Sequence, residues 1–146
     1  MKLPFNRFPK RLQMASIFTR IVRGEIPAYK VAETEEFLAF LDVRPQAKGH
    51  TLVIPKEEID YLFDLEPETL SRLMQFAQRV AQGVRQAVPC LRVGVAVIGL
   101  EVPHAHVHLI PLQTMQDINF SKSPLSFPPA EMEVLAAAIA ERISLD

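Results

Sequence analysis

The chain has 146 residues, of which 49% are hydrophobic and 23% are charged, so wholesale disorder is excluded and a single globular domain is expected. The 16 Lys and Arg residues and the 17 Asp and Glu residues leave a formal net charge of −1, which gives no bulk attraction to nucleic acid. The single cysteine, Cys90, excludes an intramolecular disulfide and a cysteine-rich zinc site, and it favours a reducing, cytoplasmic environment. No apolar run approaches the roughly 18 residues of a membrane span, so no membrane partner is expected.

The first organised element is predicted directly after a basic segment. Residues 1–14 contain two prolines and no periodic pattern, which indicates a flexible tail. Residues 15–146 are expected to form one domain that ends in a helix. Ser16 can cap a short helix over residues 17–23, and Gly24 ends that helix.

The next segments alternate short apolar runs with turns, and they predict three strands, at residues 29–34, 36–41 and 51–55. A long helix is predicted over residues 67–87, because its apolar residues recur with the 3.6-residue period and Pro67 suits a first helical turn. Pro89 stops this helix.

Two more strands and a helix are predicted in the second half of the chain. The apolar runs at residues 91–98 and 102–110 indicate two strands joined by a short turn. Residues 113–128 are polar and contain prolines, which indicates a loop, and Pro129 opens a last helix over residues 130–143. Neighbouring strands with short connections, and helices between them, indicate an α+β fold with an antiparallel sheet.

Three of the four histidines alternate along the second of these strands, at His104, His106 and His108. Alternate residues of a strand point to one face, so the imidazoles are expected to form a row whose neighbours start about 6.6 Å apart. Imidazole is a nucleophile and a hydrogen-bond partner near pH 7, and phosphoryl transfer needs a nucleophile, charge neutralisation and a proton donor. The row therefore favours chemistry at a phosphate. A metal site and a solvated strand face are alternative explanations, but strict alternation places the rings too far apart to share one tetrahedral ion easily, so no metal is expected.

Residues 104–110 match the pattern His-φ-His-φ-His-φ-φ, in which φ is apolar, and the chain thereby resembles the histidine triad nucleotide-binding family, in its branch of small phosphoramidase-like hydrolases. Further segments are similar to that family, at residues 16–27, 37–47 and 50–56, and the similarity covers about residues 15–112. The resemblance implies a five-stranded antiparallel sheet that pairs with a second copy into a ten-stranded sheet. It thus implies a homodimer that takes a purine nucleotide, and no cofactor is expected.

The resemblance also implies roles for the histidines. The middle residue, His106, would attack the α-phosphorus of a nucleotide and form a nucleotidyl-imidazole intermediate, which water then cleaves. His104 would orient His106 through its backbone carbonyl, and His108 would contact phosphate oxygens. His50, the fourth histidine, resembles an additional active-site histidine of the family.

The same resemblance implies where the nucleoside binds. Asp42 occupies the place that binds ribose, and a carboxylate that accepts from two vicinal hydroxyls makes physical sense there. An apolar purine slot is implied at six positions that would serve equally well as plain core: Ile17, Phe18, Ile21, Phe40, Val43 and Leu52.

The chain departs from the family pattern at several positions. Glu101 stands where relatives often present a small hydroxyl or another polar group near the phosphate, and a carboxylate facing the site would repel phosphate. Glu101 is therefore a candidate for substrate selectivity, unless it points to solvent. The cysteines of a Cys-x-x-Cys zinc site found in some bacterial relatives are missing, which implies no structural zinc, and Glu57 and Glu58 replace a family histidine.

The resemblance therefore implies a hydrolase that cleaves purine nucleoside phosphoramidates or adenylylated compounds. A diadenosine polyphosphate hydrolase and a nucleotidyl transferase are alternatives with the same fold, although transferases usually carry Gln at the last motif position, where this chain has His108. A nucleotide-binding or partner-binding module with incidental turnover is the alternative from another class.

Overall fold

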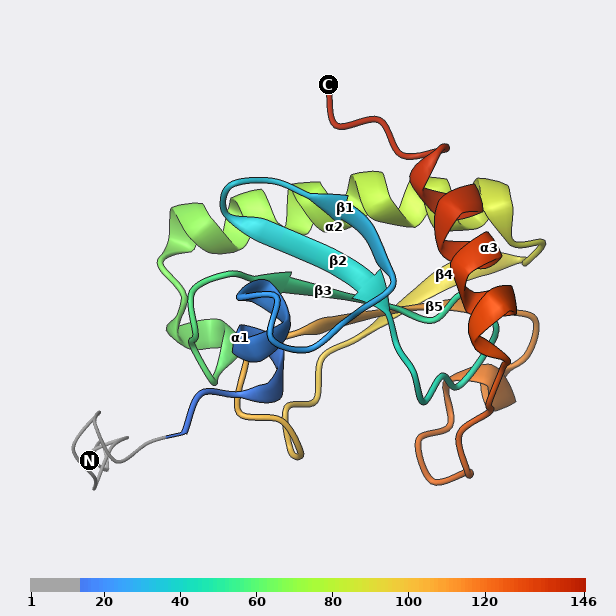
Figure 1. Ribbon diagram of the computed structural model, residues 1–146, viewed down its shortest axis with the longest axis horizontal. Helices are drawn as coiled ribbons and strands as arrows, with labels where there is room; N and C mark the ends of the chain where they lie inside the picture. Colours follow the sequence, from blue (N-terminus) through green and yellow to red (C-terminus); the bar gives the residue numbers. More distant parts are fainter. Residues whose placement is uncertain (1–13) are drawn as a thin grey trace.

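The computed structural model describes residues 14–146, and these residues form one five-stranded antiparallel sheet with helices on both faces (Figure 1). The spatial order of the strands is β1-β2-β3-β5-β4. Their bounds are Lys30–Glu33 for β1, Phe37–Leu41 for β2, Thr51–Pro55 for β3, Arg92–Ala96 for β4 and Val107–Leu112 for β5. The antiparallel sheet of the α+β prediction is confirmed, whereas all but one residue of the tail predicted at residues 1–14 lie outside the described residues.

The helices account for the remaining regular structure. Their bounds are Ile17–Val22 for α1, Pro67–Ala87 for α2 and Pro129–Ala140 for α3, and short 3₁₀ helices lie at Leu62–Asp64 (η2) and Met115–Ile118 (η3). Ser16 caps α1 by accepting a hydrogen bond from the Thr19 amide. Within residues 14–146 we find no helix with the length and apolar content that crossing a membrane requires.

Side-chain alternation places two apolar layers on the two faces of the sheet. All five residues of β2 and all five of β3 are buried, because both faces of these central strands are covered. On one face Ala39 and Val53 pack with α2 and α3. On the other face Leu38 and Leu52 pack with α1. The short α1 therefore rests on the face opposite to the long α2.

Two predicted elements differ from the structure at their ends. The strand predicted at residues 102–110 begins only at Val107, because the edge of β3 beyond Val53 is taken by a side chain: the His104 ring donates to the Pro55 carbonyl in place of a ladder bond. The helix predicted over residues 130–143 ends at Ala140, because the amides of Arg142 and Ile143 bond to carbonyls three residues back and tighten the last turn.

The remaining boundaries agree more closely with the sequence. The strand at residues 51–55 and the helix at residues 67–87 have the predicted bounds. The strand predicted at residues 91–98 is shorter and ends at Ala96, and the segment predicted as a loop at residues 113–128 contains η3. Leu125 in that segment donates its amide to the Pro45 carbonyl at 2.8 Å, so the loop is fastened to the β2–β3 connection.

Candidate active site

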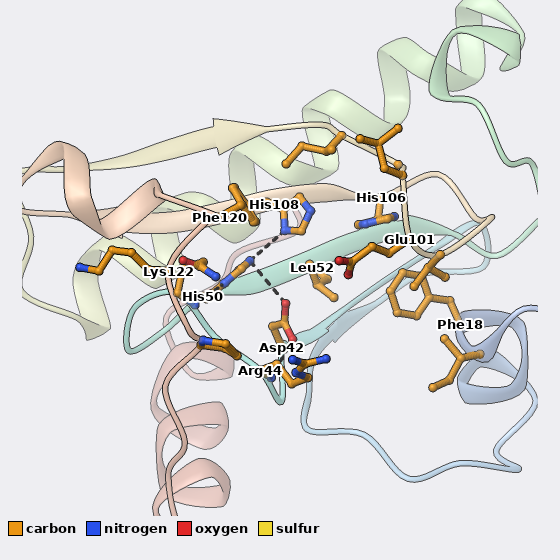
Figure 2. A pocket seen from close by; sticks show the side chains of 17 residues that line it. Phe18, Asp42, Arg44, His50, Leu52, Glu101, His106, His108, Phe120 and Lys122 are labelled. Atoms are coloured by element: carbon orange, nitrogen blue, oxygen red, sulfur yellow. Dashed lines mark hydrogen bonds and ion pairs between the residues drawn. The ribbon is translucent and has the colours of Figure 1, made fainter.

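A cavity of about 530 Å³ lies between α1 and the face of the sheet that it covers, and its walls contain residues from segments far apart in the sequence (Figure 2). His106, His108 and His50 line it, together with Asp42 and Glu101. The ring centroids of His106 and His108 are 4.9 Å apart. His104 is fully buried against Phe18 and does not line the cavity, so two of the three motif rings are exposed to it.

Backbone contacts place the proton on the His106 ring. The Nδ1 of His106 lies 2.6 Å from the His104 carbonyl oxygen, which can only accept a hydrogen bond, so Nδ1 carries the proton. The lone pair of the neutral ring is then on Nε2. The Phe18 ring meets His106 edge-on, with centroids 5.1 Å apart, and further restricts its orientation. The contact expected from His104 to His106 is therefore present, and it leaves His106 with one nucleophilic nitrogen.

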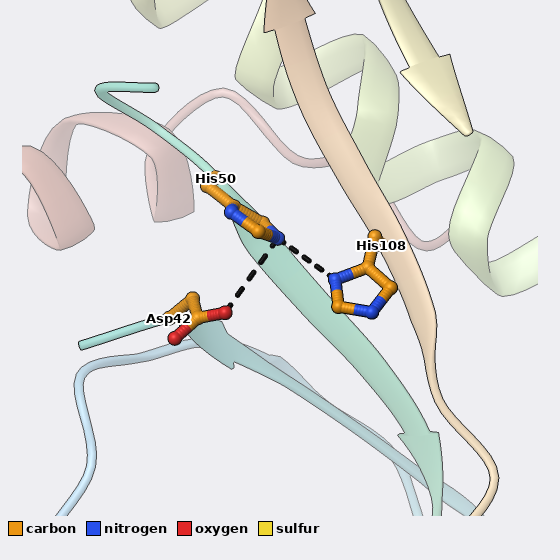
Figure 3. Close-up of side chains that lie close together, drawn as sticks. All are labelled: Asp42, His50 and His108. Carbon is orange, nitrogen blue, oxygen red and sulfur yellow. Dashed lines mark hydrogen bonds and ion pairs between the residues drawn. The ribbon is translucent and has the colours of Figure 1, made fainter. Parts of the chain in front are cut away.

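A second chain of hydrogen bonds determines the protonation of His50 and His108. The Gln46 amide donates to His50 Nδ1 at 3.0 Å, so the proton of neutral His50 is on Nε2. That nitrogen lies 2.9 Å from His108 Nδ1 and donates to it (Figure 3). His108 therefore carries its own proton on Nε2, where it can be donated to a ligand oxygen.

Burial keeps both of these rings neutral. Burial, with the nearby His108 and His106 rings, lowers the pKa of His50 to about 3. Burial and the neighbouring His106 lower the pKa of His108 to about 4. Both rings are uncharged at pH 7, so His108 presents an oriented N–H group to the cavity rather than an imidazolium ion, while the N–H group of His50 is used by His108.

Asp42 approaches the same pair of histidines. Its Oδ2 lies 3.6 Å from His50 Nε2, and its Oδ1 accepts the Arg44 amide at 2.9 Å. Burial, with a smaller contribution from Glu101, raises the pKa of Asp42. Its side chain is still 20% exposed, so its oxygens are accessible from the cavity.

Asp42, His50 and His108 form a possible metal-binding cluster, because one ligand atom from each lies within 4.8 Å of the others. Coordination through His50 Nε2 would require the neutral ring to carry its proton on Nδ1. The Gln46 amide proton points at Nδ1, so that arrangement would place two donors face to face. The chemistry of the donors therefore does not fit a metal ion unless this backbone amide moves.

The six expected purine-slot residues divide into three groups. Ile17, Phe18 and Leu52 line the cavity. Ile21 and Phe40 are buried behind Phe18 in the same apolar cluster. Val43 is 66% exposed and is not part of the cavity wall.

Several cavity residues were not found by the sequence reasoning. The connection between β4 and β5 contributes Ile98, Gly99, Leu100 and Val102, and the other walls contain Arg44, Gln46, Phe120, Lys122 and Pro124. The Phe120 ring meets His108 edge-on with centroids 5.0 Å apart and His50 with centroids 6.3 Å apart. An aromatic side chain within a mostly polar segment was the available signal for Phe120.

Comparisons with known proteins identify the family of this chain. The model of the HIT domain matches residues 23–115. The chain belongs to the HIT-domain family. It is 39% identical over 104 residues to the adenosine 5'-monophosphoramidase of Saccharomyces cerevisiae, a match that covers 70% of this chain and 66% of the yeast protein.

Two further relatives match over nearly their whole length. The adenosine 5'-monophosphoramidase of Schizosaccharomyces pombe is 33% identical over 134 residues, which cover 89% of this chain and 99% of that protein. The crystal structure of a HIT-like protein of Bartonella henselae superposes with a TM-score of 0.77 at 31% identity and covers 88% of this chain and 96% of that one. The five-stranded sheet described above is therefore the HIT fold.

Proposed function

We propose that this HIT protein is a nucleotide hydrolase that cleaves purine nucleoside phosphoramidates or adenylylated compounds at the α-phosphate. The observation that carries the proposal is the pair of fixed tautomers, with the bare Nε2 of His106 beside a His108 that holds its proton on Nε2. One ring is thus prepared to attack phosphorus and the other to donate to a phosphate oxygen. The names of the two yeast relatives support the phosphoramidase assignment.

The reaction takes place in two displacements at phosphorus. In the first, a bond forms between His106 Nε2 and the α-phosphorus while the bond to the leaving amine breaks and the amine gains a proton. The positive charge that develops on the His106 ring is stabilised by the His104 carbonyl at Nδ1. In the second, water attacks phosphorus, the bond to Nε2 breaks, and the proton that water loses balances the proton that the amine gained.

The nucleoside is placed by the rest of the cavity. The purine lies against Ile17, Phe18 and Leu52, with Ile21 and Phe40 supporting Phe18 from behind. The Asp42 carboxylate accepts from the ribose hydroxyls. Each of these groups lines or supports the same cavity as His106, so the α-phosphate and the base are bound in one pocket.

Release of AMP from adenosine 5'-phosphoramidate tests the proposal. The purified protein is expected to release AMP, and His106→Asn is expected to lose at least about 100-fold in kcat, because the substitution removes the covalent nucleophile. The circular dichroism spectrum of the variant should stay that of the wild type. A folded His106→Asn variant that retains more than a few per cent of kcat would exclude the nucleophile role. A wild-type protein that binds AMP without turnover would instead indicate a binding module.

A further inference from the structure

A chain of hydrogen bonds behind the nucleophile joins α1 to the segment between β3 and η2. The His104 ring lies 2.8 Å from the Pro55 carbonyl through Nε2 and 2.8 Å from the Ser16 hydroxyl through Nδ1. The Thr19 hydroxyl lies 2.7 Å from Glu58 Oε1, and the Ser16 amide lies 2.5 Å from the same oxygen. Ser16, Thr19 and His104 are buried, whereas Glu58 reaches in from the exposed surface.

The shortest contacts assign the protons of this hydrogen-bond chain, in which the Ser16 and Thr19 hydroxyls also lie 3.2 Å apart and the Thr19 hydroxyl lies 3.3 Å from His104 Nδ1. The Pro55 carbonyl only accepts, so His104 carries its proton on Nε2 and accepts at Nδ1 from the Ser16 hydroxyl. The carboxylate of Glu58 only accepts, so the Thr19 hydroxyl and the Ser16 amide both donate to it. Partial burial raises the pKa of Glu58, but the hydrogen bonds from Ser16 and Thr19 outweigh that effect and hold the pKa below its usual value. Glu58 therefore stays ionised near neutral pH.

This hydrogen-bond chain is connected to both halves of the proposed site, the nucleophile and the purine slot. On one side, the His104 carbonyl holds His106 at Nδ1. On the other, Phe18 lies between Ser16 and Thr19 in sequence, and its ring contacts His104 and His106 edge-on, with centroids 5.8 and 5.1 Å apart. A shift of α1 on the sheet would therefore displace Phe18, which is a wall of the proposed purine slot. The same shift would remove the contact of Phe18 with the His106 ring.

We propose that Glu58 is a positioning residue of the active site, which acts through Ser16, Thr19 and His104 to fix Phe18 against the nucleophile. Glu58 is not among the cavity residues, so it acts without touching the substrate. The inference rests on the proposed function for its kinetic consequence. Its consequence for nucleotide binding is independent of turnover, because Phe18 lines the cavity in either case.

Three variants separate positioning from general destabilisation. Glu58→Ala removes the acceptor and is expected to lower kcat/KM for adenosine 5'-phosphoramidate by roughly tenfold to a hundredfold, since small misplacements at a reacting centre cost that much. Both KM and kcat should change, because the slot and the nucleophile are both affected. Glu58→Gln keeps an acceptor oxygen and should recover most of the loss. Glu57→Ala, a neighbouring exposed glutamate outside this chain of bonds, is the matched control and should behave as the wild type.

AMP affinity, measured by calorimetry well below the unfolding temperature, is the second readout. Glu58→Ala is expected to weaken AMP binding, and combining it with Phe18→Leu should weaken binding by less than the product of the two separate effects, because both act on one wall. A folded Glu58→Ala protein with wild-type kcat/KM and AMP affinity but a lower melting temperature would overturn the inference and leave Glu58 a structural residue. If the wild type binds AMP but does not hydrolyse the phosphoramidate, the proposed function fails, and the AMP measurements still decide the role of Glu58.

Discussion

Backbone groups, rather than the spacing of the histidines, decide what each imidazole can do. The His104 carbonyl fixes the proton of His106 on Nδ1. The Gln46 amide fixes the proton of His50 on Nε2, and the hydrogen bond from His50 in turn fixes the tautomer of His108. Two acceptor or donor contacts therefore turn three similar side chains into a nucleophile, a donor and a support. These contacts depend on which carbonyl or amide ends up beside each ring, and no side-chain pattern encodes that.

The buried neutral histidines predict a loss of stability in mild acid. The pKa of His50 is lowered to about 3 and that of His108 to about 4, whereas both take up a proton near pH 6.5 when unfolded. The unfolded chain therefore binds more protons as the pH falls. The stabilisation is fully present above pH 6.5 and is lost progressively toward pH 4, by about 1.4 kcal/mol per pH unit for each ring.

Urea unfolding at pH 7.5, 6 and 5 measures this effect. The free energy of unfolding is expected to fall between pH 6 and pH 5, and these two rings should contribute a slope that corresponds to the uptake of roughly two protons on unfolding. The lowered pKa of His104 adds to this fall, whereas the raised pKa of Asp42 opposes it. His108→Asn should reduce the slope by about one proton. An unfolding free energy that is flat from pH 7.5 to pH 5 would show that these rings are not held neutral.

Metal independence is a second expectation at the residue scale. The Gln46 amide directed at His50 Nδ1 leaves Nε2 protonated and unsuited to coordination. Protein treated with EDTA and then dialysed is therefore expected to retain its AMP-releasing activity in full. Restoration of activity by one added equivalent of zinc, after loss on chelation, would contradict the tautomer assignment.

Glu101 belongs to the wall of the cavity, so its carboxylate is placed to influence the choice of leaving group. Like charges in a partly enclosed site repel, so polyphosphate leaving groups should be disfavoured against a neutral or cationic amine. Glu101→Gln is expected to raise kcat/KM for a diadenosine polyphosphate more than for a lysine-like amine phosphoramidate. Equal changes for the two substrates, or none, would show that the carboxylate does not interact with the phosphate chain.

At the scale of elements, local signals were enough wherever an element is stabilised by its own pattern. The period of α2 and the apolar run of β3 are of this kind, and both have the predicted bounds. The start of β5 could not be predicted from local signals. It depends on a hydrogen bond from the His104 ring to the carbonyl of Pro55, which lies more than 40 residues away in sequence. The loop that carries Phe120 also depends on a distant contact, between Leu125 and Pro45, so its place in the site was missed.

The loop that carries Phe120 is expected to shield the histidine pair from water. The Phe120 ring lies against His108 and His50, and burial is the largest cause of their lowered pKa values. Phe120→Ala should therefore raise the pKa of His108 toward its ordinary value, which an NMR titration of the ring protons would measure. Phe63→Ala, at an aromatic residue that is 70% exposed and outside the cavity wall, is the control. An unchanged His108 titration in Phe120→Ala would mean that the loop does not shield the pair.

For the whole molecule, the open edge of the sheet at β4 is the feature that bears on association with a second copy. Among the described strands β4 pairs only with β5, so its other edge is open to a further strand. Exposed apolar side chains accompany this edge, with Val95 at 54% and Leu91 at 73% exposure, and they continue beyond it at Val97 and Ile98. An open apolar edge is a liability for a single chain unless another strand covers it.

We therefore expect the homodimer that the resemblance implies, with β4 of one copy beside β4 of the other in a continuous ten-stranded sheet. Light scattering at micromolar concentration should give twice the chain mass of 16.5 kDa. Val95→Lys places a charge at the open edge and should shift the mass toward that of a single chain, since edge lysines oppose strand pairing. Val134→Lys, on the exposed side of α3 where Val134 is 71% exposed, is the matched control and should remain dimeric. A wild-type mass of 16.5 kDa, or a dimer that Val95→Lys leaves intact, would exclude β4 as the interface.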